Sequence, residues 1–189
     1  MRIGLIGGSF DPVHTGNLLL AEGARETLRL DRVIWIPAAA PPHKSAGLSA
    51  PVEERVRMVE LAIEGNPAFE VSRIELERSG PSYTIDTVRR LREIHPGADN
   101  RWFFLIGSDT AAELSTWRSI DELRKLVEFA AAPRPGSRGL ATPWVTELDV
   151  RTLAVSASEI RARVQEGRSI RYLVPEPVRA AIERKGLYR

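Results

Sequence analysis

Short apolar runs alternate along this chain with longer segments in which apolar residues recur at helical spacing. The apolar runs are bounded by Gly, Pro or polar residues and predict strands at 3–6, 33–36, 69–76, 102–106 and 129–132. The amphipathic segments predict helices at 18–30, 53–63, 83–94, 121–127, 158–164 and 177–185. Strands that alternate with helices indicate an α/β protein with an open parallel sheet and helices on both of its faces.

The length and the pattern predict one structural unit. A chain of 189 residues suits a single domain with a substantial core, and no internal repeat or linker divides it. We therefore expect one Rossmann-like domain over residues 1–189, with its longer loops at 38–52, 77–82 and 133–144. The wholly apolar run at 102–106 is expected near the centre of the sheet, because strands buried on both faces read as continuous hydrophobic runs.

The composition excludes several classes of protein. Hydrophobic residues make up 43% of the chain, which excludes a disordered segment, and 27 basic against 25 acidic residues give a net charge of +2. Because this balance creates no strong field, we expect neither nucleic acid nor a membrane as a partner. The lack of cysteine excludes disulfides, thiolate metal sites and cysteine nucleophiles. Neither a signal peptide nor a bilayer-spanning run is recognisable, so we expect a cytoplasmic protein.

The turn after the first predicted strand carries the first candidate chemistry. The strand ends in two glycines, and the chain enters the first helix as Gly7-Gly8-Ser9-Phe10-Asp11-Pro12-Val13-His14-Thr15-Gly16-Asn17. Ligands of open α/β sheets bind at the carboxyl ends of strands, where glycines let the backbone approach phosphate and a helix N-terminus supplies N–H donors. His14 and Asn17 are three residues apart and share one helix face, from which both can donate hydrogen bonds to phosphate oxygens.

Two common nucleotide-binding motifs are absent from this turn. The spacing is not G-x-G-x-x-G, which disfavours dinucleotide binding of the dehydrogenase type, and no G-x-x-x-x-G-K-[ST] sequence occurs. A structural alternative stays open for the single residues. The glycines and Pro12 could simply form a turn, and His14 could cap or pack against the helix.

The turn as a whole resembles the nucleotidylyltransferase superfamily, whose signature is G-[ST]-F-D-P-x-H-x-G-H. The matching residues are Gly8, Ser9, Phe10, Asp11, Pro12, His14 and Gly16. Asn17 stands where the family has its last histidine, a position that by this resemblance helps to hold the ATP phosphates. Asparagine keeps a hydrogen-bond donor but cannot carry charge, so this departure concerns the strength of phosphate stabilisation.

A second segment resembles the other signature of the superfamily, I-S-S-T-x-I-R. This chain has Val155-Ser156-Ala157-Ser158-Glu159-Ile160-Arg161 there. The resemblance implies that Ser156, Ser158 and Arg161 contact the ATP triphosphate. Part of the segment has a second explanation, because Ser156 and Glu159 satisfy the S-x-x-E pattern of a capping box.

Further segments are similar to one branch of the superfamily, the bacterial nicotinate-nucleotide adenylyltransferases. They follow the order of that family over nearly the whole chain, at residues 41–44, 80–87, 106–109, 116–117, 133–136 and 169–175. The resemblance adds Gly107, Asp109 and Arg134 to the ATP site, beside Gly8, Ser9, Phe10 and Gly16. It places Tyr83, Thr84 and Trp117 at the nicotinate mononucleotide, and His14, Asn17, Lys44 and Arg161 at the reacting phosphates.

The residues themselves suit these roles, although each has a structural alternative. Trp117 offers a flat π-face for a pyridine ring, and the alternative is a core tryptophan, which we expect for Trp35 and Trp102. The backbone N–H groups of Tyr83 and Thr84 open a helix and can receive a carboxylate. The Asp109 carboxylate can accept a ribose hydroxyl, or cap a helix.

The resemblance implies transfer of an adenylyl group from ATP to nicotinate mononucleotide, which gives deamido-NAD and pyrophosphate. His14, Lys44, Arg161 and the helix N-termini are expected to supply a positive field, and Mg²⁺ is expected to arrive with the ATP phosphates, because no carboxylate cluster suggests an all-protein metal site. Two rival functions stay open, another reaction of the superfamily and a nucleotide-binding regulator without catalysis. Whether the chain forms a homo-oligomer also stays open.

Overall fold

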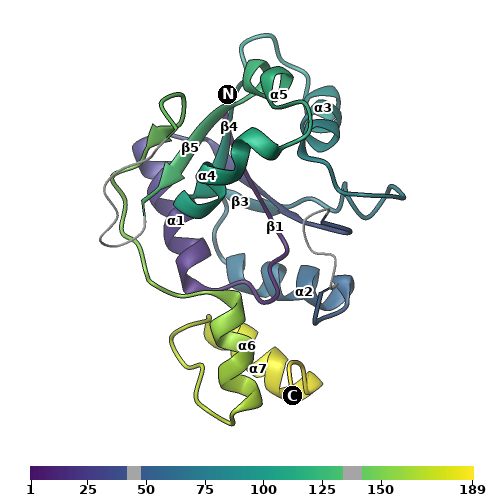
Figure 1. The fold of residues 1–189 in the computed structure, drawn as a ribbon, viewed down its shortest axis with the longest axis vertical. Coiled ribbons are helices and arrows are strands. Elements are labelled where there is room, and N and C mark those ends of the chain that lie inside the picture. The colour runs from purple at the N-terminus through teal and green to yellow at the C-terminus, as the bar shows by residue number, and fades with distance from the viewer. Residues whose placement is uncertain (42–47, 134–141) are drawn as a thin grey trace.

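The strands form one parallel sheet. The computed structural model describes residues 1–41, 48–133 and 142–189, and in these residues six strands pair in the order β3-β2-β1-β4-β5-β6, every neighbour parallel (Figure 1). The strands are β1 (Arg2–Gly8), β2 (Arg32–Pro37), β3 (Phe69–Val71), β4 (Arg101–Gly107), β5 (Glu128–Ala132) and β6 (Thr146–Glu147). The predicted open parallel sheet is therefore confirmed, and β1 and β4, two apolar runs, form its centre.

Helices cover both faces of the sheet, as predicted. The described helices are α1 (Thr15–Thr27), α2 (Val52–Ile63), α3 (Thr84–Ile94), α4 (Ser108–Glu113), α5 (Ile120–Leu126), α6 (Ala157–Gln165) and α7 (Glu176–Lys185), with a 3₁₀ turn at Leu114–Thr116. Buried residues of α1, α2, α6 and α7 belong to one hydrophobic cluster, and those of α3, α4 and α5 belong to another. The two clusters lie on opposite faces of the sheet.

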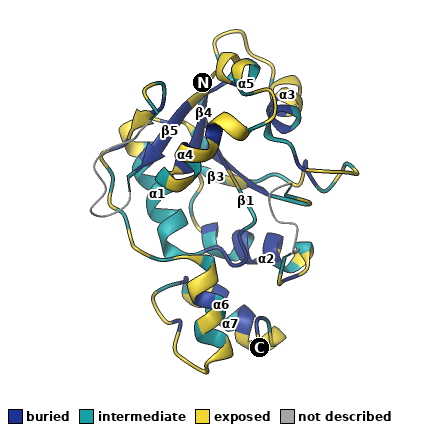
Figure 2. Ribbon diagram, in the orientation of Figure 1, coloured by how far each residue is buried: buried dark blue, intermediate teal, exposed yellow. Residues whose placement is uncertain are grey.

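The strand side chains alternate between the two clusters. Along β4, Phe103 and Leu105 pack with α1 and α2, whereas Trp102, Phe104 and Ile106 pack with α3 and α5. All five side chains are buried, so the strand contributes apolar surface to both faces at once, which is why its sequence reads as a continuous apolar run. Figure 2 shows the buried strands at the centre of the molecule. Trp35 and Trp102 are buried in the core, as expected.

The last two helices share the core of the sheet. Ile160 of α6 and Val178 and Ile182 of α7 belong to the same buried cluster as Ile6 of β1. Although α6 and α7 lie at one end of the molecule in Figure 1, α7 also packs against α2. Because one core extends from β1 to α7, we propose that residues 1–189 fold as one domain.

Several element boundaries differ from the prediction. The strand predicted at 69–76 ends at Val71, and the chain turns so that the Leu76 N–H donates to the Arg73 carbonyl at 2.8 Å. The first helix lies three residues earlier than predicted at both ends, at 15–27 instead of 18–30. The sequence also did not predict α4 and β6, because six and two residues are too few to show a period.

None of the helices in the described ranges has the length and apolar character that a membrane crossing requires.

The packing of α1 predicts the effect of a single methyl group. A Cβ atom on Gly23 would lie 2.8 Å from Cβ and Cγ1 of Val150. We expect Gly23→Ala to destabilise the protein by about 1–2 kcal/mol in urea unfolding, because overpacking outweighs the gain of about 1 kcal/mol in helix propensity. Glu26→Ala, at an exposed position of the same helix, is the control and should cost nothing measurable. Equal stability of the two variants would contradict the close contact.

Candidate active site

Two adjoining cavities open at the carboxyl ends of β1 and β4. These strands are neighbours, but the chain continues from β1 to β2 on one side and reaches β4 on the other, and ligands of open α/β sheets bind at such a reversal of strand order. The cavities have volumes of about 470 Å³ and about 230 Å³. They share a wall, which consists of Gly7, Gly8, Ser9, Phe104, Thr110 and Trp117. A ligand with two parts can therefore extend from one cavity into the other.

The shared wall includes the first three residues of the glycine turn, which we define as residues 7–14. A Cβ atom on Gly7 would lie 3.1 Å from the Phe104 ring, and one on Gly8 would lie 3.2 Å from the Phe10 ring, so the turn is tightly packed where it borders the cavities. Phe10 has a positive φ of 46°, an unusual backbone for a non-glycine residue. Its ring is buried 5.4 Å from that of Trp35, so the ring belongs to the core, although Phe10 also borders the smaller cavity.

Two arginines fix the backbone of the glycine turn. Arg55 of α2 is 1% exposed, and its Nη1 donates to the Ser9 carbonyl at 2.6 Å. Burial lowers the pKa of Arg55, an effect that the nearby Asp11 and Tyr188 partly oppose. Arg161 of α6 donates from Nη1 to the Asp11 carbonyl at 2.8 Å. The carbonyl groups of Ser9 and Asp11 thus point to these two guanidinium groups.

His14 and Asn17 lie together on the first turn of α1 and both line the smaller cavity. The backbone N–H of His14 donates to Asn17 Oδ1 at 3.0 Å, so the Asn17 side chain caps the helix. The side-chain amide N–H groups of Asn17 remain available as donors. His14 Nδ1 is buried and has no hydrogen-bond partner among the described residues. Both predicted phosphate-binding side chains therefore belong to the same small cavity.

Burial determines the charge state of His14. It lowers the pKa of the imidazole from 6.5 to about 4, so the side chain is neutral near pH 7. The expectation that His14 adds a positive charge needs correction for the ligand-free protein. Here the side chain is a neutral hydrogen-bonding group, as Asn17 is.

Arg161 of the second signature contacts the glycine turn, and most residues of the segment do not line the cavities. Ser156 Oγ accepts a hydrogen bond from the Glu159 N–H at 3.1 Å, so the capping explanation holds for this residue. Ser158 Oγ accepts from Arg161 Nη2 at 3.4 Å. Of residues 156–161 only Ala157 borders the smaller cavity. The segment therefore stabilises the turn through the Arg161 contact to the backbone.

Gly16 and the end of β4 complete this compartment. A Cβ atom on Gly16 would lie 3.0 Å from Val155 Cγ1 and 3.1 Å from His14 Nδ1, so glycine is needed where the second signature packs on α1. Gly107 ends β4 and lines the smaller cavity. Asp109 lies in the first turn of α4 and is not among the residues that line either described cavity.

Trp117 borders both cavities. Its ring is half-buried and meets Phe104 edge to face at 5.8 Å and Phe129 at 6.2 Å, so core aromatic rings fix its orientation. Trp117 is neither a wholly buried core residue nor a free surface one. It is a rigid π-surface on a cavity wall, as a stacking role requires.

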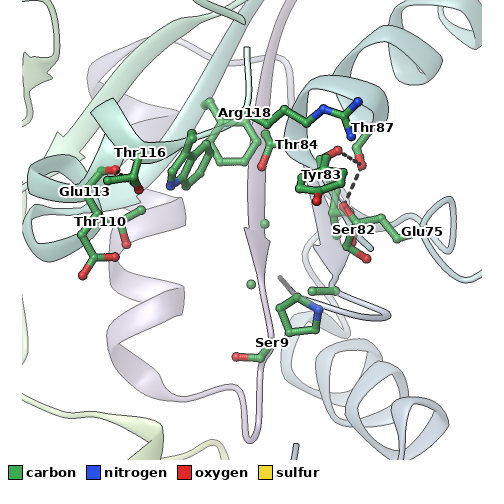
Figure 3. A pocket seen from close by; sticks show the side chains of 17 residues that line it. Ser9, Glu75, Ser82, Tyr83, Thr84, Thr87, Thr110, Glu113, Thr116 and Arg118 are labelled. Atoms are coloured by element: carbon green, nitrogen blue, oxygen red, sulfur yellow. Dashed lines mark hydrogen bonds between the residues drawn. The ribbon is translucent and has the colours of Figure 1, made fainter. Parts of the chain in front are cut away.

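The larger cavity also contains the start of α3. Tyr83 and Thr84 line it, as the sequence predicts (Figure 3). The Tyr83 N–H already donates to the Pro81 carbonyl at 3.0 Å, whereas the Thr84 N–H has no acceptor in the described part of the chain. Of the two predicted donors, Thr84 is thus the one available to a carboxylate. Arg118, which the sequence reasoning missed although it adjoins Trp117, places its guanidinium 4.6 Å from the centre of the Tyr83 ring.

A buried polar group that was not predicted lies beneath the α3 N-terminus. Thr87 donates from Oγ1 to Glu75 Oε1 at 2.7 Å (Figure 3). It accepts from Arg78 Nη2 at 2.9 Å, and Arg78 also donates to the Tyr83 carbonyl at 3.2 Å. Glu75 is buried, and its Oε2 has no hydrogen-bond partner within the described ranges. The group fixes the carbonyl of the residue that precedes α3. The sequence analysis could not predict these contacts, because it placed Glu75 in a strand at 69–76.

Two predicted residues lie outside the described part of the chain. Lys44 falls in 42–47, and Arg134 falls in 134–141. The predictions for them stay untested. Within the ranges that the structure describes, no three His, Asp or Glu side chains are grouped so as to hold a metal ion.

Comparison with known proteins identifies relatives over the full length. The family model described as cytidylyltransferase-like matches residues 5–163. A protein of Exiguobacterium sibiricum named probable nicotinate-nucleotide adenylyltransferase is 49% identical over 190 residues, which cover 100% of this chain and 99% of the relative. A protein of the same name from Thermus thermophilus is 47% identical, with 100% of both chains covered.

Solved structures of low sequence identity share the fold. The Plasmodium falciparum nicotinic acid mononucleotide adenylyltransferase complexed with NaAD aligns with a TM-score of 0.80 at 19% identity, over 99% of this chain and 97% of that one. The same Plasmodium enzyme complexed with APC aligns with a TM-score of 0.79 at 17% identity, over 99% and 96% of the two chains. At these identities the likeness establishes the fold alone.

The lowered pKa of His14 predicts how stability depends on pH. Between pH 6.5 and 4 the unfolded chain binds a proton at this residue and the folded protein does not, so the free energy of unfolding falls as the pH falls through this window. We expect the wild type to lose about 2–3 kcal/mol more than His14→Asn between pH 7.5 and 4.5, at 1.36 kcal/mol per pKa unit. Urea unfolding at both values tests this. Equal losses for the two proteins would show that His14 is not buried in its neutral form.

Proposed function

This chain belongs to the nicotinate-nucleotide adenylyltransferases, a group of nucleotidyltransferases within the cytidylyltransferase-like family, and from that membership we infer its reaction. It joins ATP to nicotinate mononucleotide and releases deamido-NAD and pyrophosphate, a step of NAD biosynthesis. The observation that carries this proposal is the pair of cavities with a common wall at Gly7–Ser9. Two nucleotides can bind there with their phosphates meeting at the glycine turn.

The two cavities suit different halves of the product. The larger one combines the fixed ring of Trp117 with the free N–H of Thr84, a stacking surface beside a carboxylate donor at a helix N-terminus. This combination fits a pyridine ring with a carboxylate. The smaller one combines His14, Asn17 and the end of β4 at Gly107, where phosphate and nucleoside of ATP can bind side by side. The mononucleotide phosphate then lies near the shared wall.

The reaction needs little covalent help from the protein. The mononucleotide phosphate has a second pKa of about 6, so it is largely ionised at neutral pH and needs no general base. One of its oxygens attacks the α-phosphorus of ATP in line, and pyrophosphate leaves. The protein contributes position and hydrogen bonds. His14 and Asn17 donate to phosphate oxygens, and the N-terminus of α1 adds its dipole to the same compartment.

Magnesium is best regarded as part of the ATP substrate. The Asp11 carboxylate in the glycine turn accepts hydrogen bonds from Ser49 and Ala50 N–H groups, so it is not available as a ligand in the cavity. Together with the lack of a three-ligand group in the described residues, this argues that the ion binds chiefly to phosphate oxygens and water. The proposal assigns the chain no resident metal.

A comparison of acid and amide substrates tests the reaction. Pyrophosphate release is followed with ATP and Mg²⁺, using nicotinate mononucleotide or nicotinamide mononucleotide as the second substrate. We expect the acid to be adenylylated with the higher kcat/KM, because the amide lacks the negatively charged carboxylate that would accept a hydrogen bond from the Thr84 N–H. Turnover of neither mononucleotide, with retained ATP binding, would favour a regulatory nucleotide-binding protein instead.

Removal of the Trp117 ring should weaken one substrate selectively. We expect Trp117→Ala to raise KM for the mononucleotide about 10-fold or more, since stacking and apolar contact with an aromatic side chain contribute about 1–3 kcal/mol. KM for ATP should change much less. Trp117→Phe, which keeps an aromatic face, is the matched control and should recover much of the loss. Equal weakening of both substrates would argue that Trp117 only supports the core.

Substitutions of Asn17 separate its capping role from its donor role. Asn17→Asp keeps the acceptor for the His14 N–H but replaces the amide donor with an anion in the phosphate cavity, so we expect turnover to fall about 100-fold with the fold intact. Asn17→His restores the residue type of the superfamily signature and should be at least as active as the wild type. Turnover and thermal unfolding of both variants decide this. Normal activity of Asn17→Asp would exclude Asn17 from the phosphate site.

A further inference from the structure

The Asp11 carboxylate lies within the glycine turn and faces away from the cavities. It is 1% exposed and accepts three hydrogen bonds, from the Ser49 N–H at 2.8 Å, from the Ala50 N–H at 3.1 Å and from the Tyr188 hydroxyl at 2.8 Å. Its own carbonyl receives Arg161 at 2.8 Å. Every contact of Asp11 thus serves to hold the turn, and one of them comes from a residue 177 positions away.

Tyr188 follows α7 and reaches the glycine turn from the far end of the chain. Its side chain is 7% exposed and belongs to the same buried cluster as Phe10 and Val13. Its backbone has a positive φ of 65°, so the ring is delivered by a turn rather than by the helix itself. Tyr188 lies outside residues 5–163, the part of the chain that matches the family model.

The Tyr188 hydroxyl is a permanent donor. Burial raises its pKa, and the Asp11 charge and hydrogen bond raise it further, so the phenol keeps its proton at any pH at which the protein is assayed. The contact to Asp11 is therefore a buried, charge-assisted hydrogen bond, the stronger class of such bonds. A bond of this kind restrains the turn in a single position.

We propose that Tyr188 is a positioning residue for adenylyl transfer, acting through Asp11 on the glycine turn. The inference rests on the proposed function, because the turn matters for catalysis only if phosphates react there. His14 follows Asp11 by three residues, and Ser9 precedes it by two, so a shift of Asp11 moves both walls of the phosphate compartment. A displacement of about 1 Å at reacting groups can cost about 100-fold in rate.

The test removes one oxygen atom. Tyr188→Phe keeps the ring in the core and leaves Asp11 with its two backbone donors, so we expect a folded protein. We expect kcat to fall about 10-fold or more, with KM for the mononucleotide within about 2-fold of the wild type, because the turn is misplaced while the Trp117 side is unchanged. Tyr172→Phe is the matched control, since the Tyr172 side chain is 84% exposed, and it should retain full activity.

A purely structural role of Tyr188 predicts a different kcat for the Tyr188→Phe variant. If Tyr188 contributed only to stability, kcat at a temperature where the variant is fully folded would match the wild type, and that result overturns the proposal. A double-mutant cycle with His14→Ala adds a second criterion. Tyr188→Phe should cost much less in the His14→Ala background, because the residue acts by positioning the turn that carries His14, and full additivity would overturn that route.

Hydrogen exchange separates this inference from the proposed reaction. Backbone amides of residues 9–14 should exchange faster in Tyr188→Phe than in the wild type or Tyr172→Phe, with ATP bound and without it. Unchanged exchange in all three proteins would overturn the proposal. If the wild type binds ATP but releases no pyrophosphate, the proposed function fails, and the exchange measurement still decides whether Tyr188 holds the turn. Should Tyr188→Phe unfold at the assay temperature, turnover and exchange are compared at a lower temperature at which the variant is fully folded.

Discussion

The hydrogen bonding of one buried carboxylate is the constraint on which this active site depends. An ionised carboxylate in a protein interior is costly unless donors replace its hydration. Asp11 obtains them from the backbone at Ser49 and Ala50 and from Tyr188, and Arg55 supplies a nearby positive charge. Because these partners come from distant segments of the chain, the glycine turn reaches its final shape only when sheet, α2 and the residues after α7 have assembled. Folding and the preparation of the phosphate compartment are therefore one event.

The charged groups around the turn support the backbone, whereas the described residues that line the smaller cavity are all neutral. Arg55 and Arg161 donate to carbonyls of the turn, whereas His14, Asn17 and the Thr84 N–H border the substrate compartments in uncharged form. Fixed neutral donors cost little to desolvate, and they need no change of protonation between neutral and mildly acidic pH. Positive charge for the triphosphate then has to come from the metal that accompanies ATP and from residues such as Lys44, for which the sequence predicts this role.

The fold was largely predictable, and the reasons for the exceptions are physical. Long apolar runs predict buried strands, and amphipathic segments predict helices that cover them. The predicted strand at 102–106 and the predicted helix at 53–63 therefore lie close to the observed bounds of β4 and α2. α4 was missed because a helix of six residues is too short to show a helical period. The prediction of a strand at 69–76 was wrong after Val71. Ile74 and Glu75 are buried there, but Ile74 packs in the core and Glu75 accepts a hydrogen bond from Thr87, and neither residue belongs to the sheet.

The site was predictable where a local motif carries the chemistry. His14 and Asn17, which the glycine-turn motif indicated, line the smaller cavity, whereas Thr84 lines the larger cavity and Trp117 lines both; their roles toward the substrates stay predictions. Contacts between distant residues could not be predicted from a single sequence. The Arg161 contact to the Asp11 carbonyl joins residues 150 positions apart. Arg55 and Tyr188 belong to none of the sequence motifs, so their contacts with the turn could not be predicted.

The common wall of the two cavities has a consequence for the fate of the product. Deamido-NAD carries both nucleotide halves in one molecule, so it can occupy both compartments at once. Once one half of such a ligand is held, the other half binds at high effective concentration, and the whole is retained more tightly than either reactant. If both halves bind as proposed, we expect the geometry at Gly7–Ser9 to slow the release of the dinucleotide. The accumulated dinucleotide would then inhibit its own synthesis by occupying the two substrate compartments.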